Sequence, residues 1–105
     1  MQPIRTIITV ESLPSGQYSW FKIMGDILPK IKVISFTHDE IDHCVTIEAM
    51  LGRDTDLEEF GCNIADEVSS LFQRKSEVFK NYLLTGASQL SLVGANRPIV
   101  TIHPY

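Results

Sequence analysis

The first half of the chain alternates between apolar and polar side chains with the period of two that is typical of β-strands. Residues 4–11, IRTIITVE, and residues 31–37, IKVISFT, are rich in branched and aromatic side chains, which favour strands. The clearest alternation runs over residues 41–51. Its two expected faces are Ile41, His43, Val45, Ile47, Ala49 and Leu51 on one side and Asp42, Cys44, Thr46, Glu48 and Met50 on the other. We therefore expect three strands, the third antiparallel to the second.

Two other segments repeat their apolar residues every three or four positions, as one stripe of a helix does. The stripe of the first consists of Tyr18, Phe21, Met24, Ile27 and Leu28. Because Pro29 cannot continue a helix, this one should end near Leu28. The stripe of the second consists of Leu57, Phe60, Ile64, Val68, Leu71 and Phe72. Thr55 followed by Glu58 forms a capping box that predicts where this helix begins, and we expect it to break near residues 73–77.

The last quarter of the chain leaves two structures open. Residues 78–84 fit a helix or a strand, and the segments QLSLV and PIVTIH around the turn-like GANR predict either a hairpin or one returning strand. The order strand, helix, strand, strand, helix, strand predicts an α+β fold of the two-layer ferredoxin-like (βαββαβ) kind. In it, two helices cover one face of an antiparallel sheet. We expect a single domain over residues 1–105, since 105 residues supply one core.

The other face of this sheet should remain open. If the alternation above is right, it carries five apolar side chains, which are Ile7, Ile34, Phe36, Cys44 and Met50. An apolar open face usually marks a contact surface, so we expect a homodimer or a bound partner there.

The charge is uneven along the chain. The net charge is −4, but residues 39–67 hold ten acidic residues against Arg53 alone. Such a molecule lacks the broad basic footprint of a nucleic-acid binder and instead suits a basic protein partner. The candidate partner-binding residues are Asp54, Asp56, Glu58, Glu59, Phe36 and Met50.

The segment THDEIDHC, residues 37–44, contains ligand types that zinc accepts, in His38, His43 and Cys44. Neighbouring side chains in a strand point to opposite faces, so His43 and Cys44 should not meet at one ion. The alternative is a solvated bend between two strands, which we favour. We therefore expect no catalytic residue, no metal and no cofactor.

Targeting signals are absent from the pattern of the sequence. No apolar run reaches the ~20 residues that a membrane helix needs, and no basic segment followed by a hydrophobic one opens the chain. Without a secretion signal, we expect Cys44 and Cys62 to be reduced thiols and the protein to be cytoplasmic.

Residues 6–36 resemble the first half of an ACT domain, in which a strand leads through a turn with proline and glycine into a helix and a second strand. ACT domains are regulatory modules that usually dimerise and bind amino acids near that turn. The resemblance implies ligand contacts from Leu13, Pro14, Ser15 and Gly16. The aromatic side chains of Tyr18 and Trp20 could line the same pocket, although core packing is the usual role of such residues.

These patterns support three hypotheses about function. The first is a small non-enzymatic protein-binding module, of the adaptor or immunity type, that uses the acidic segment and the open sheet face and self-associates. The second is an ACT-like regulatory domain that senses a small ligand. The third is a metal- or thiol-dependent enzyme built on His38, His43 and Cys44.

Overall fold

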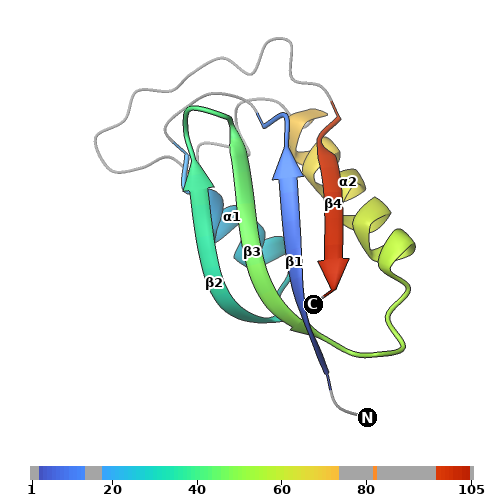
Figure 1. The fold of residues 1–105 in the computed structure, drawn as a ribbon. Helices are drawn as coiled ribbons and strands as arrows, with labels where there is room; N and C mark the ends of the chain where they lie inside the picture. Colours follow the sequence, from blue (N-terminus) through green and yellow to red (C-terminus); the bar gives the residue numbers. More distant parts are fainter. Residues whose placement is uncertain (1–2, 14–17, 74–81, 83–96, 105) are drawn as a thin grey trace.

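The computed structural model describes residues 3–13, 18–73, 82 and 97–104. Its elements follow in the order β1 (Ile4–Glu11), α1 (Trp20–Ile27), β2 (Lys32–Asp39), β3 (Cys44–Leu51), α2 (Leu57–Gln73) and β4 (Ile99–Pro104). The strands form one sheet in the order β2-β3-β1-β4, and every neighbouring pair is antiparallel (Figure 1). The fold is therefore of the α+β class, with a four-stranded antiparallel sheet and two helices.

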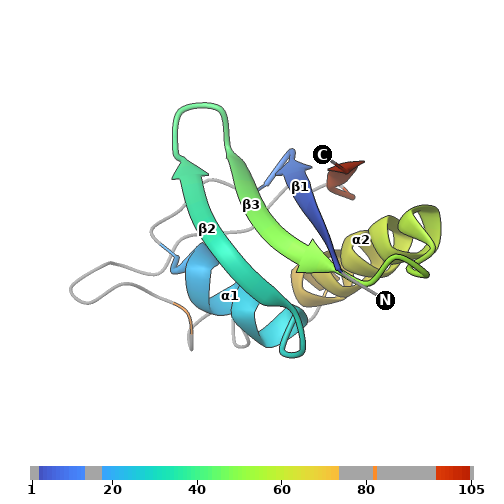
Figure 2. The same ribbon diagram turned by 60° about the horizontal axis from the view of Figure 1, so that its bottom comes forward.

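The core lies between the sheet and the helices. Every second residue of β1 and β3 is buried, as the alternation predicts, including Ile8, Val10, Val45 and Ile47. Both helices add buried side chains to the same cluster. Figure 2 shows α1 beneath β2 and β3, and α2 on the same side toward β1 and β4. Both helices thus cover one face of the sheet, and no described helix or strand covers the other, which we call the open face.

Helix α1 begins and ends where its sequence can satisfy the free backbone groups. The Ser19 hydroxyl accepts from the backbone N–H of Lys22 at 3.3 Å, and the N–H of Leu28 donates to the carbonyl of Met24 at 2.9 Å. The predicted end near Leu28 is confirmed. The predicted stripe is wrong at Phe21, which is 66% exposed. Its neighbour Trp20 is buried instead, together with Ile23 and Met24.

The third strand begins later than its alternation predicts. Residues 40–43 form the bend between β2 and β3, and Ile41 is 89% exposed rather than on the core face. His43 has a φ of 53°, which lies in the left-handed region and cannot continue a strand. Its carbonyl accepts from the N–H of Leu13 at 3.0 Å. The strand prediction was therefore wrong for residues 41–43 and is confirmed from Cys44 to Leu51.

A bulge in β2 changes which of its side chains face the helices. Val33 pairs with Ala49, but the next pair joins Ser35 to Glu48, so Ile34 is the extra residue. After the bulge, Phe36 lies opposite the buried Ile47, on the helix side. The Phe36 ring packs edge-to-face on Phe21, with 5.3 Å between centroids. The prediction that Phe36 lies on the open face was wrong, because a single inserted residue reverses the faces.

The register instead brings threonines together on the open face. Thr46 of β3 lies opposite both Thr37 of β2 and Thr9 of β1, and Thr9 lies opposite Thr101 of β4. One row of four threonines therefore crosses the whole sheet. The open face is more polar than the sequence predicts.

Helix α2 begins one residue later than predicted. The carboxylate of Asp56, not the hydroxyl of Thr55, accepts from the backbone N–H three residues on, that of Glu59, at 3.1 Å. The predicted capping box is therefore displaced by one position. The helix runs to Gln73, and the chain returns to the sheet through β4. The predictions for residues 78–84 and for QLSLV lie outside the described residues, apart from Tyr82.

Candidate protein-binding surface

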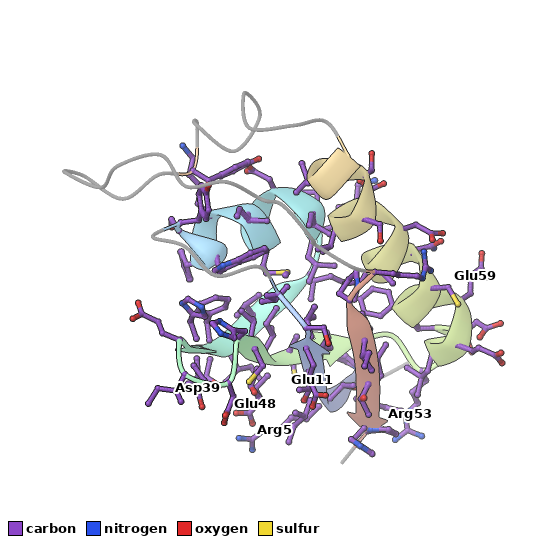
Figure 3. All side chains as sticks on the ribbon, turned by 90° about the horizontal axis from the view of Figure 1, so that it is seen from above. Arg5, Glu11, Asp39, Glu48, Arg53 and Glu59 are labelled. Atoms are coloured by element: carbon purple, nitrogen blue, oxygen red, sulfur yellow. The ribbon has the colours of Figure 1, made fainter. Side chains whose placement is uncertain are left out.

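Four carboxylates gather where the chain enters α2. Asp54, Asp56, Glu58 and Glu59, which we call the acidic start of α2, are all exposed, and Arg53 is the only cation among residues 53–59. Asp56 caps the helix, and the two glutamates occupy its first turn, where the helix dipole favours negative charge. The fold therefore concentrates negative potential at a solvent-facing position. Figure 3 shows Glu59 and Arg53 projecting outward on the side of the molecule away from Asp39.

A groove of about 450 Å³ separates α2 from β4. Small side chains of the helix line one wall, at Gly61, Cys62 and Ala65, and Val100 and Ile102 of β4 line the other. A Cβ at position 61 would lie 3.3 Å from Cδ1 of Ile102, so glycine permits this close approach of helix and strand. The groove is largely apolar and open to solvent.

Charged residues stand at the two ends of this groove. Glu58 lines the end beside the acidic start of α2. At the other end, Nη1 of Arg97 lies 2.6 Å from Oδ1 of Asp66, and both side chains are more than half exposed. An exposed pair of this kind contributes little to stability. It neutralises the Arg97 end, so the net negative charge is at the Glu58 end.

The open face of the sheet carries one ion pair in its middle. The guanidinium of Arg5 donates to Glu48, and the Ser35 hydroxyl donates to the other carboxylate oxygen at 3.2 Å. The hydrogen bond from Arg5, followed by that from Ser35, lowers the pKa of Glu48 although partial desolvation opposes the shift. Met50, one of the predicted partner contacts, is half-buried in the next row, between Arg5 and Lys32. The other, Phe36, is on the helix face.

The segment THDEIDHC forms a bend whose groups bind its own backbone. Oδ1 of Asp39 accepts from the N–H groups of Ile41 and Asp42, at 2.9 and 3.1 Å. These bonds, chiefly the one from Asp42, lower the pKa of Asp39. Within the part of the chain that the structure describes, no three residues of the His, Cys, Asp and Glu types are placed to hold a metal ion.

Cys44 is not activated as a nucleophile. Desolvation raises the pKa of its thiol, and the nearby carboxylates of Asp39, Asp42 and Glu11 raise it further. The thiolate, which is the reactive form, is therefore disfavoured at neutral pH. His38 pairs with Val45, and the neighbouring pair joins Asp39 to Cys44. Because successive pairs along a strand point to opposite faces of the sheet, His38 and Cys44 lie on opposite faces.

The core contains three of the residues predicted to contact a ligand, either from the ACT resemblance or from their aromatic character. Leu13, Tyr18 and Trp20 are 5%, 2% and 1% exposed. Pro14, Ser15 and Gly16 lie outside the described residues. The predicted ligand site therefore stays a prediction.

The groove was not predicted from the sequence. Gly61 and Ala65 are four residues apart, so both lie on one face of α2, and that spacing of small residues was the available signal for a close neighbour. The position of β4 beside that face depends on long-range pairing, for which the sequence offers no local sign.

Comparison with family models, with curated proteins and with solved structures finds no match to this chain. Among the described residues, no helix is both long and apolar enough to cross a membrane.

Proposed function

We propose that this protein is a small non-enzymatic binding module whose acidic start of α2 holds a basic surface of a protein partner. The observation that supports this most is the exposure of Asp54, Asp56, Glu58 and Glu59 together at the start of a helix. Opposite charge across an interface accelerates encounter and selects partners, and it acts over about 8 Å at physiological ionic strength. An adaptor or an immunity-type protein that neutralises a basic partner is the concrete form of the proposal.

Charge reversal tests this function. A variant with Asp54, Glu58 and Glu59 each changed to Lys retains the helix cap at Asp56 and reverses the surface charge. Partners recovered from native lysate on the wild-type protein, then purified, should bind the variant at least about tenfold more weakly, with a reduced dependence on salt. A control reverses two carboxylates at the far bend, Glu40 and Asp42, and should bind the partner as the wild type does. If the wild type and the charge-reversal variant bound the partner equally, with equal salt dependence, the proposal would be refuted.

Self-association through the open sheet face is the second part of the proposal. Ile7, Cys44 and Met50 are half-buried there and would supply apolar contact, whereas Phe36 takes no part. Light scattering on the purified protein should show a dimer that Met50→Lys converts to a monomer. If the wild-type protein were a monomer at high concentration, the proposed self-association would be refuted.

The finer classification of the fold is also a proposal. The order βαββαβ with the strands arranged as β2-β3-β1-β4 supports the ferredoxin-like arrangement. The free thiols of Cys44 and Cys62 support a cytoplasmic location. The ligand-sensing and enzymatic hypotheses stay predictions, because the described residues contain no observation that favours either.

A further inference from the structure

Within the described part of the chain, the outer edge of β4 is available for pairing. Among the described residues, β4 pairs with β1 alone and stands last in the sheet. One row of its backbone N–H and C=O groups therefore has no ladder partner within the described part of the chain. Such an edge is a template on which another extended segment can form a strand.

The groove lies beside this edge. Val100 and Ile102 direct their side chains to the helix face, since Ile102 lies opposite the buried Ile8 and Val100 opposite Val10. A segment paired with β4 would direct every second side chain into the same space, between the strand and the small residues Cys62 and Ala65 of α2. An edge strand next to a helix-walled groove thus offers backbone bonds for affinity and side-chain pockets for specificity.

The charge at the groove indicates the chemistry of the occupant. Helix α2 runs antiparallel to β4, because Gly61 approaches Ile102 while Asp66 binds Arg97. The end of the groove near Ile102 is therefore the end at Glu58 and the acidic start of α2, and the Arg97 end is neutralised by Asp66. A cationic side chain is favoured at the Glu58 end, and no carboxylate is favoured there.

We propose that the groove between α2 and β4 binds an extended, basic segment of a partner protein, which adds to the sheet as a fifth strand next to β4. This inference rests on the proposed function and specifies how the partner is held. The segment would place small apolar side chains at alternate positions into the groove and a Lys or Arg beside Glu58. β4 has six residues, so the paired stretch is of similar length.

The probe is an eight-residue capped peptide that alternates Val and Thr and carries Lys at both ends. Titration followed by amide chemical shifts should show saturable changes at residues 99–103 and along one face of α2. A peptide with Pro at its two central positions should bind about tenfold more weakly or not at all, because Pro cannot donate to a ladder. A peptide with Glu in place of Lys should also bind more weakly.

Two variants of one exposed residue make the test specific. Cys62→Tyr fills the groove from the surface of α2, and Cys62→Ser leaves it open. We expect Cys62→Tyr to weaken peptide binding by about tenfold or more and Cys62→Ser to retain it, with both variants showing native amide spectra. Loss of binding in both variants, or in neither, would overturn the inference.

The remaining outcomes separate this inference from the function on which it rests. If charge reversal at α2 abolishes binding of the natural partner and Cys62→Tyr does not, the function stands and the strand-addition site is wrong. If Cys62→Tyr converts a dimer of the free protein to a monomer, the groove holds a second copy of this chain, which also overturns it. No binding of the peptide up to about 1 mM would do the same.

Discussion

Tyr82 is bound to Asp26 across 56 residues of sequence, with the Tyr82 hydroxyl donating to Oδ2 of Asp26 at 2.9 Å. The Tyr82 carbonyl also accepts from the N–H of Ser19 at 2.6 Å, so one residue contacts both the start and the last turn of α1. Tyr82→Phe should lower the free energy of unfolding by about 1 kcal/mol at neutral pH, measured by urea denaturation. Asp26→Asn keeps an acceptor and should lose less. Equal stability of Tyr82→Phe and the wild type would contradict this.

The same contact predicts a dependence on alkaline pH. Burial, and then the bond to Asp26, raises the pKa of Tyr82 above its ordinary value of 10.0. Above pH 10 the unfolded chain releases this proton before the folded one does, so the stabilisation is complete below about pH 10 and is lost as pH rises through the folded pKa. The wild type should therefore lose stability faster than Tyr82→Phe as the pH rises above 10. Parallel stability curves of the two proteins would refute this.

Asp39 predicts the opposite dependence, at acid pH. The N–H of Asp42 is the main cause that holds the pKa of Asp39 below 3.8, and desolvation opposes it. The folded state then favours the carboxylate, so the stabilisation is present above pH 3.8 and is lost as pH falls through the folded pKa. Carbon-detected NMR titration should give a pKa for Asp39 below its ordinary value of 3.8. Asp39→Asn should flatten the stability curve below pH 4, and an unchanged curve would contradict the assignment.

The corrected face of α1 predicts unequal effects of two neighbouring truncations. Ile23 is 0% exposed and Phe21 is 66% exposed. Ile23→Ala should cost about 3 kcal/mol, because it leaves a cavity in the core. Phe21→Ala removes an exposed ring and its edge contact with Phe36, so it should cost about 1 kcal/mol. The sequence alone predicts the reverse order, and thermal unfolding of both variants distinguishes the two.

Local patterns predicted the elements of this fold, and long-range geometry decided the faces. The alternation in β1 and in β3 from Cys44 onward correctly separated the buried side chains from the others, since one face of these strands packs into the core. The bulge at Ile34 moved Phe36 to the opposite face. Nothing in IKVISFT indicates a bulge, because it is set by the pairing with β3.

The same distinction applies to the candidate site. The acidic start of α2 is contiguous in sequence and could be predicted as a cluster, because a helix N-terminus favours carboxylates. The groove and the row of Thr37, Thr46, Thr9 and Thr101 could not, since both depend on which strands become neighbours.

His43 predicts how the bend tolerates substitution. Its φ of 53° is costly for residues with a branched Cβ and is free for glycine. His43→Val should lower the free energy of unfolding by about 1–2 kcal/mol, and His43→Gly should match or exceed the wild type. At Thr46, which is extended, the order should reverse, with Val tolerated and Gly destabilising. Greater loss with His43→Gly than with His43→Val would show that the imidazole has a role beyond the bend.

Asp56 allows the capping role to be separated from the binding role. Its carboxylate accepts from the N–H of Glu59, and it also belongs to the acidic start of α2. Asp56→Ala should cost about 1 kcal/mol of stability, whereas Asp56→Asn keeps the acceptor and should cost only a few tenths. Thr55→Ala should cost less than Asp56→Ala, because the hydroxyl of Thr55 does not cap the helix.

If Asp56→Asn nevertheless weakens partner binding as much as Asp56→Ala does, the charge and not the helix start determines recognition. Unfolding curves and titrations on the same samples give both quantities, and equal destabilisation by Thr55→Ala and Asp56→Ala would show that the cap is misassigned.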